Sequence, residues 1–174
     1  DTNTEIISSL MSSLLDQQKY DEMNQYLSSV SDDNSLSYLK GIAAMGLKKY
    51  DEAETHFQKV LASGDKGLST KVYLNRVRNF FLAERYNEAI QAGEQYLSRI
   101  NPEKEKAIYS EMLDKIGLSY FRIGKYDQAR SYYSKIASMK GYEVYGKYQI
   151  ADSYYNEKNY AKAGELYKAI YNNY

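Results

Sequence analysis

Apolar residues recur every three or four positions along most of the chain, with polar residues between them. In the first such stretch, residues 3–17, Ile6, Leu10 and Leu14 fall on one face of a helix. Further stretches with the same spacing follow at residues 21–30, 35–47, 51–62, 69–83, 87–100, 102–123, 127–139, 143–157 and 161–172. We therefore predict an all-α chain in which the helices follow one another in pairs.

A five-residue box precedes or opens the second helix of each predicted pair. Its copies occupy residues 19–23, 49–53, 85–89, 125–129 and 159–163, and each has Tyr in second place. Successive box tyrosines are 30, 36, 40 and 34 residues apart. A period of this length is typical of a solenoid, in which each repeat packs on its neighbours only. We expect one repeat domain over residues 1–174, with repeats at about 3–33, 34–66, 69–101, 102–140 and 143–174.

The box and its surroundings predict several local features. The Asp or Asn after the box Tyr is expected to cap the second helix in four repeats. A small residue, such as Ala53 or Ala129, is expected where the two helices of a pair cross. A bulky residue four positions later should pack on the next repeat, and Gly93 in its place predicts a loose interface. The sequence Asn101-Pro102 predicts the start of a longer helix that runs to about Ile123.

One repeat carries a more specific motif. Residues Gly117 to Tyr133 read Gly-x-x-Tyr-Phe-x-x-Gly-x-Tyr-Asp-x-Ala-x-x-x-Tyr. This segment resembles the tetratricopeptide repeat, and the similarity extends over essentially the whole chain. The resemblance implies a right-handed superhelical α-solenoid of about five helix-turn-helix repeats. It also implies that the first helices line a concave groove that binds protein segments.

The resemblance assigns three rows of residues to this groove, one residue from each first helix. The rows are Leu15, Met45, Phe81, Phe121 and Tyr155; Ser12, Ile42, Arg78, Leu118 and Asp152; and Ser8, Tyr38, Leu74, Asp114 and Tyr148. The candidate groove residues are Tyr38, Ile42, Met45, Leu74, Arg78, Phe81, Leu118, Phe121, Tyr148 and Tyr155. Such a mixed surface suits an extended segment or an amphipathic helix with apolar anchors. The alternative is that the apolar row packs between repeats, as aromatic stripes at helical spacing usually do.

The family's clamp for the acidic tails of chaperones can be compared with this chain. The clamp uses Lys, Asn and Arg side chains on successive inner helices. The matching positions here are Ser8, Ser12, Leu39, Lys71 and Asn75, and a shift by one repeat gives Tyr38, Ile42, Asn75, Glu111 and Lys115. Neither set forms a clamp, so we do not expect this chain to bind chaperone tails.

The last predicted helix has an apolar face. Its residues are Leu166, Ile170, Tyr171 and Tyr174. A solenoid usually ends in a polar capping helix, so this face predicts an interface with a second copy, with further repeats or with a partner. The sequence therefore leaves two alternatives to peptide binding. The chain could be an oligomerisation module, or it could be the repeat domain of a larger envelope-associated or catalytic protein.

The composition gives no indication of catalysis or of nucleic-acid binding. The 23 basic and 23 acidic residues cancel, so no net field attracts nucleic acid. The chain has no Cys, a single His at position 56 and no phosphate-binding loop, so we expect no catalytic residue, cofactor or metal site and no enzyme. No apolar run is long enough for membrane insertion. The content of Asn, Lys and Tyr favours a bacterial source, and the compartment, cytoplasm or cell envelope, stays open.

Overall fold

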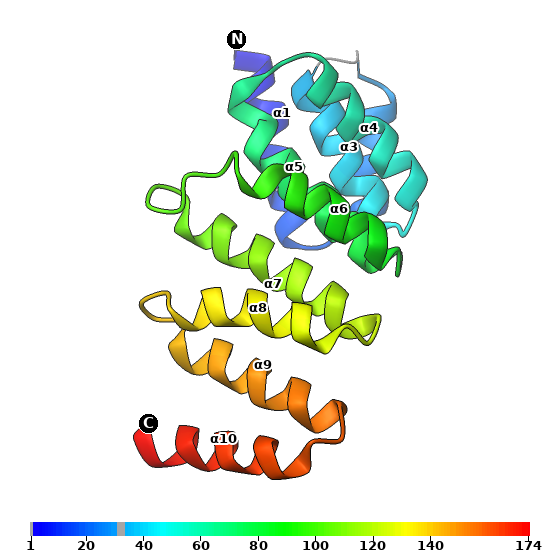
Figure 1. Ribbon diagram of the computed structural model, residues 1–174. Helices are drawn as coiled ribbons and strands as arrows, with labels where there is room; N and C mark the ends of the chain where they lie inside the picture. Colours follow the sequence, from blue (N-terminus) through cyan, green and yellow to red (C-terminus); the bar gives the residue numbers. More distant parts are fainter. Residues whose placement is uncertain (1, 31–33) are drawn as a thin grey trace. The chain divides into compact units, whose positions relative to one another are not determined.

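A computed structural model describes residues 2–30 and 34–174, and these residues form helices without any strand (Figure 1). The all-α prediction is thus confirmed. The helices are α1 (Thr2–Asp16), α2 (Tyr20–Ser28), α3 (Asn34–Gly46), α4 (Tyr50–Ala62), α5 (Lys66–Leu82), α6 (Tyr86–Leu97), α7 (Lys106–Arg122), α8 (Tyr126–Ala137), α9 (Glu143–Asn156) and α10 (Tyr160–Asn173).

The chain divides into two compact units, with the boundary inside α5 between Asn79 and Phe80. Unit 1 contains α1 to α4 and most of α5, and its core has two apolar clusters. Met11, Met23 and Leu27 of the first helix pair are fully buried in one of them. Phe57 and Val60 of α4 are fully buried in the other, together with residues of α3 and α5.

Unit 2 contains the end of α5 and helices α6 to α10. Helices α7, α8, α9 and α10 lie one beside the next, and each runs back along the preceding one (Figure 1). Leu113 of α7 and Ala129, Tyr133 and Ile136 of α8 form a buried cluster in this unit. In unit 2, α7 with α8 and α9 with α10 therefore form two hairpins, and the first packs on the second, as expected for repeats.

The turn inside each hairpin has the same backbone conformation. The residue two positions before the box Tyr has a positive φ in every repeat: Gln18 (56°), Lys48 (61°), Glu84 (59°), Gly124 (74°) and Lys158 (68°). The left-handed region costs a residue with a Cβ roughly 1–2 kcal/mol, and only the fourth repeat avoids this cost with glycine. The turn places the box Tyr as the first residue of the second helix.

This turn explains why the capping prediction was wrong. The position before the second helix is held by Lys19, Lys49, Arg85 and Lys125, none of which makes a side-chain capping bond. The box Asp lies two residues after this position, within the first turn of the helix, where its negative charge is favourable at the positive end of the helix dipole. The fifth repeat differs, because Asn159 occupies the cap and its side chain accepts a hydrogen bond from the Lys162 N–H at 3.2 Å.

The prediction of a long helix that starts at Pro102 is also wrong. Asn101 does stabilise a turn there, because its Oδ1 accepts hydrogen bonds from the backbone N–H of Glu103 (3.0 Å) and Lys104 (3.1 Å). Helix α7, however, begins only at Lys106. The spacing of 40 residues between Tyr86 and Tyr126 therefore includes a separate turn before α7.

Glycines on the helices make room for bulky side chains. A Cβ added to Gly41 would lie 2.5 Å from Cε1 of Phe57, and one added to Gly117 would lie 3.0 Å from Cε1 of Tyr133. Gly93 also has such a neighbour, since an added Cβ would lie 2.5 Å from Cγ1 of Ile116. The expectation of a loose interface at Gly93 is therefore wrong: Ile116 of α7 fills the space that a side chain at this position would take.

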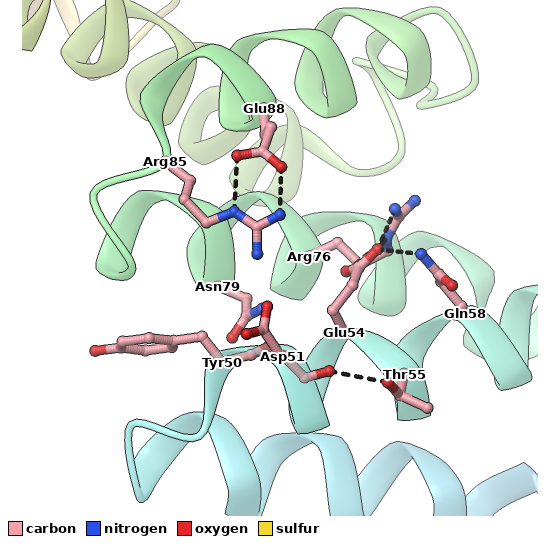
Figure 2. Close-up of polar contacts among 9 residues, drawn as sticks. All are labelled: Tyr50, Asp51, Glu54, Thr55, Gln58, Arg76, Asn79, Arg85 and Glu88. Atoms are coloured by element: carbon pink, nitrogen blue, oxygen red, sulfur yellow. Dashed lines mark hydrogen bonds and ion pairs between the residues drawn. The ribbon is translucent and has the colours of Figure 1, made fainter.

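Polar contacts join the last two helices of unit 1. Arg76 of α5 donates through Nε to both carboxylate oxygens of Glu54, at 2.9 and 3.0 Å, and a second donor of its guanidinium also contacts this carboxylate (Figure 2). Gln58 donates to the same carboxylate at 2.8 Å. The buried Asn79 side chain donates to the backbone carbonyl of Tyr50 at 2.8 Å, which ties α5 to the start of α4.

Arg130 joins α8 to α9 in unit 2. Its side chain donates to Glu157 at 2.8 Å and to the Ser153 hydroxyl at 3.3 Å, and it also contacts Asp127 of its own helix. The guanidinium lies 4.0 Å from the centre of the Tyr154 ring. Only 9% of Arg130 is exposed, so its charge is matched by carboxylates and by an aromatic face inside the interface.

Candidate functional site

The candidate groove residues of unit 1 form a short polar network on α3 and α5. The Asn75 side chain donates to the Tyr38 hydroxyl at 3.0 Å, and Arg78 donates to Asn75 Oδ1 at 2.9 Å. Burial raises the pKa of Tyr38, while the hydrogen bond with Asn75 and the charge of Arg78 act in the opposite direction. The structure therefore brings Tyr38 and Arg78 together through Asn75, which was not among the candidates.

The apolar candidates of unit 1 contribute mainly to the core. Ile42 is 6% exposed and Leu74 is 5% exposed, so they offer a ligand little surface. Met45 is half-buried and packs against the cluster around Phe57. At these three positions, the burial favours the alternative interpretation, in which the row packs between repeats.

In unit 2, the row of aromatic residues packs inside each hairpin. Each ring lies edge-on against the box Tyr of its own repeat. The pairs are Phe81 with Tyr86 (5.5 Å between ring centres), Phe121 with Tyr126 (5.4 Å) and Tyr155 with Tyr160 (5.3 Å). The four rings of the first two pairs are half-buried, whereas 54% of Tyr155 is exposed. These side chains thus stabilise the closed end of the hairpin and still present part of their surface.

Further candidates of unit 2 lie on α7 and α9. Leu118 is half-buried beside the cluster around Tyr133, whereas half of Tyr148 is exposed. The Tyr148 ring is tilted against that of Tyr167, with 5.7 Å between the ring centres. Tyr167 in turn donates through its hydroxyl to Asp152 at 3.2 Å.

A cavity of about 420 Å³ opens beside α7, and we call it the acidic cavity. It is lined by Ala107, Ser110, Glu111, Asp114, Ile136, Tyr142 and Tyr145. The Tyr145 hydroxyl donates a short hydrogen bond to Asp114. Burial raises the pKa of Asp114, and this hydrogen bond and the charge of Lys115 oppose the shift.

Sequence reasoning placed Asp114 in a groove row but did not select it, and it missed Glu111, Tyr142 and Tyr145 as site residues. One signal was present, because Glu111 and Asp114 are three residues apart and so share a face of α7. The contribution of Tyr142 and Tyr145 carried no such signal. It depends on how the turn after α8 places the start of α9 against α7.

The apolar candidates of α10 lie beside a second hollow, of about 220 Å³, which we call the α9–α10 hollow. Its lining residues are Lys147, Ile150, Leu166, Ala169, Ile170, Asn173 and Tyr174. Lys147 donates to the Tyr174 hydroxyl at 3.0 Å. Tyr171 is not part of this lining and is 87% exposed. Three of the four predicted interface residues therefore come together.

The described residues offer little support for other kinds of site. Within residues 2–30 and 34–174, no cluster of His, Cys, Asp and Glu is arranged to hold a metal ion. His56 is half-buried on α4. No helix in the described part of the chain has the length and apolar character needed to cross a membrane.

Comparisons with known proteins agree with this architecture. The chain is similar in structure to MamA AMB-1, at 18% sequence identity and a TM-score of 0.70, with 99% of each chain covered. It is also similar to PilF of Pseudomonas aeruginosa, at 19% identity and a TM-score of 0.70, with 97% of this chain and 75% of that chain covered. No curated protein matches the sequence. At these identities, the two structures support the fold alone, and the prediction of an α-solenoid of helix-turn-helix repeats is confirmed.

The repeat itself is recognised by a sequence family. The tetratricopeptide repeat profile matches residues 38–105 and 115–174, which together make up most of the chain. These two segments include the box tyrosines Tyr50, Tyr86, Tyr126 and Tyr160, and most of the hairpins that surround them. Repeats of this kind form scaffolds for protein interaction. The chain therefore belongs to the tetratricopeptide repeat family.

Proposed function

We propose that this chain binds an extended or helical segment of a partner protein along the first helices of its hairpins. The observation that carries the proposal is the set of partly exposed apolar and aromatic side chains on α7 and α9. These are Leu118, Phe121, Tyr148 and Tyr155. Aromatic rings that are held on rigid helices and partly open to solvent are typical anchors for a peptide, because burying them gains free energy with little loss of side-chain freedom.

The fold supports a role in binding rather than in catalysis. Tetratricopeptide repeats typically form scaffolds without a catalytic role, and the hairpins of unit 2 present neighbouring first helices, α7 and α9, along which a segment can lie. We infer that the ligand is a protein segment because the partly exposed apolar and aromatic side chains on α7 and α9 are suited to anchor a peptide.

The experiment is a selection of short peptides from a random display library, followed by measurement of their affinity by fluorescence anisotropy. Tyr148→Glu places a charge on the proposed surface and should weaken binding by about tenfold or more. The matched control is Tyr171→Glu, because Tyr171 is exposed and belongs to neither the groove candidates nor the α9–α10 hollow lining. Equal affinity of all selected peptides for wild type and Tyr148→Glu would reject the groove.

The α9–α10 hollow favours a second candidate function, association through α10. Ile150, Leu166 and Ile170 line it with apolar groups, and 67% of Tyr174 is exposed at its side. An apolar hollow beside exposed tyrosines is a suitable surface for a second copy of this chain. Light scattering of wild type and of the variant with Tyr171→Glu and Tyr174→Glu tests this. A wild-type protein that is already monomeric at high concentration would refute it.

A further inference from the structure

The contact of α6 with the hairpin of α7 and α8 shows how one hairpin is covered by the helix before it. Ile116 of α7 is fully buried and fills the space beside Gly93 of α6. The hydroxyls of Tyr120 and Tyr132 both donate to Oε1 of Glu94, each at 2.8 Å. The second helix of one repeat therefore covers three side chains of the hairpin that follows it.

The first hairpin has the equivalent surface, and there it is open. Counted from the box Tyr of each repeat, the three side chains that α6 covers correspond to Leu10, Leu14 and Tyr26. These residues line a hollow of about 610 Å³ on α1 and α2, which we call the α1–α2 hollow. Its other lining residues are Glu22, Gln25 and Ser29. Leu10 and Tyr26 are both exposed, whereas Ile116, which corresponds to Leu10, is fully buried.

Helix α10 presents the matching face of a second helix. By the same count, the two α6 residues of the contact correspond to Tyr167 and Lys168. Beside them, a Cβ added to Gly164 would have nothing within 4 Å, and Tyr171 is almost fully exposed. The equivalent face of α6 is covered by α7, and that of α8 is covered by α9. Within the described part of unit 2, the face of α10 that carries these four residues, here called the α10 face, is left uncovered.

The α8–α9 contact shows that a tyrosine is accommodated at the position of Tyr167. The corresponding residue of α8 is Tyr133, which is fully buried. Ile150 of α9 packs against the apolar cluster that contains Tyr133. Ile150 is in turn the residue of α9 that corresponds to Leu10 of α1. The pair of Tyr167 and Leu10 therefore has the same chemistry as a contact that already joins two hairpins of this chain.

The first hairpin and α10 also carry opposite excess charges. The charged residues among residues 6–30 are Asp16, Lys19, Asp21 and Glu22. Lys19 forms an ion pair with Glu22 at 3.2 Å, so the excess charge of this hairpin is negative. In α10, Lys162 pairs with Glu165 at 3.0 Å, and Lys168 makes the excess charge positive. This charge complementarity favours an approach of α10 to the first hairpin.

We propose that the α10 face of one copy of this chain docks on the α1–α2 hollow of a second copy, head to tail. The proposal rests on the second candidate function, association through α10, and names the face of α10 and the surface that receives it. The occupant is a second copy because one chain carries both halves of a contact that already joins its own repeats. Each pair of copies keeps one free half at either end, so association continues until a ring closes.

The first test is complementation between two variants, followed by sedimentation velocity. Leu10→Glu with Tyr26→Glu blocks the α1–α2 hollow, and both side chains are exposed. Lys168→Glu with Tyr171→Glu blocks the α10 face. Wild type should form species larger than a dimer as its concentration rises. Each variant alone should associate at least about tenfold more weakly, whereas their equimolar mixture should form heterodimers, because each variant keeps the half that the other lacks.

The control and the opposing outcomes are specific to each idea. Leu82→Glu with Lys104→Glu makes the same change of charge as the α10 variant, at exposed positions outside both surfaces, and should associate like wild type. A hollow variant that dimerises as well as wild type would refute head-to-tail docking alone, since two copies would then meet α10 to α10. A mixture without heterodimers would also refute it. A monomeric wild type would refute association through α10 altogether and leave the peptide test of the groove unaffected.

The second test uses cross-linking and needs no charged variant. The chain contains no Cys, so Tyr26→Cys and Lys168→Cys, prepared as separate chains, each carry one reactive thiol. The two positions correspond to Tyr132 and Glu94, which meet through long side chains, so a short bis-maleimide is the suitable linker. The mixture should give cross-linked heterodimers in at least about tenfold excess over a mixture of Lys168→Cys with Leu82→Cys. Equal yields from the two mixtures would overturn the docking, even if the charged variants failed to fold.

Discussion

Replacing Gly146 by alanine should separate the last hairpin from the rest of unit 2. Gly146 is buried near the start of α9, and a Cβ built on it would lie 2.7 Å from both Cα and Cβ of Ala137, and closer still to its backbone nitrogen. Carbon atoms pack at about 3.5–4.0 Å, so α8 and α9 must move apart by roughly 1 Å. Because the neighbour is backbone, no rotation of a side chain can relieve the contact.

The size of the effect follows from two opposing terms. Overpacking costs about 1–3 kcal/mol, here toward the upper end, and the better helix propensity of alanine returns up to about 1 kcal/mol. We therefore expect Gly146→Ala to destabilise the protein by about 2 kcal/mol. Gly164→Ala is the matched control, because nothing lies within 4 Å of a Cβ at Gly164 in α10. This second change should stabilise the protein by about 1 kcal/mol.

Two measurements check this reasoning. Urea denaturation gives the free energy of unfolding of each variant, and amide hydrogen exchange shows which helices open. Since each repeat depends on its neighbours, Gly146→Ala should increase exchange mainly in α9 and α10, with much less change in α7. Gly146→Ala at wild-type stability, or exchange that rises equally in α7, would show that the α8–α9 contact does not limit the stability of this end.

Other substitutions should also change stability in predictable directions. Arg130→Lys keeps the charge but loses the fork that reaches Glu157, so thermal unfolding should reveal a loss of about 1–3 kcal/mol; no loss would contradict the role of this network. Tyr133→Phe removes a buried hydroxyl that has no hydrogen-bond partner among the described residues. It should stabilise the protein by about 1 kcal/mol in urea unfolding; a loss of stability would mean that the hydroxyl is satisfied in solution. Burial raises the pKa of Asp114 above 3.8, so the folded state holds this proton more tightly than the unfolded state. The ionised form of Asp114 therefore lowers the stability of the fold at neutral pH. Asp114→Asn should be more stable than wild type at pH 7, and this difference in stability should decrease as the pH falls toward 3.8. A stability difference that does not depend on pH would refute this.

The hairpins could be predicted from the sequence because their determinants are local. A box Tyr and a small residue such as Ala129 recur at a nearly constant spacing, and the helical period of apolar residues surrounds them. The start of each second helix could not be predicted in the same way. The left-handed residue before the box, for example Lys48, moves the cap position to Lys49, and neither residue type favours that conformation.

The residues of the candidate site were likewise predictable only where they follow a local pattern. The aromatic row, with Phe121 and Tyr155, follows the helical period and was visible in the sequence. The acidic cavity was not, because it requires Tyr142 and Tyr145 to be placed against Glu111 and Asp114 by the turn after α8. The packing of Ile116 into the space beside Gly93 could not be predicted for the same reason. A pattern along one helix does not say which side chain of the next helix enters that space.

The edge-on aromatic pairs have a consequence for how such a chain can grow or shrink. Phe121 with Tyr126, and Tyr155 with Tyr160, each lie within one hairpin, so copying or deleting a whole hairpin carries the pair along intact. Contacts between hairpins, such as those from Arg130 to Ser153 and Glu157, are particular to one junction and would be lost in a rearranged order. Duplication of a hairpin together with its following neighbour would keep that junction, so two consecutive repeats are the smallest block that carries a junction along intact.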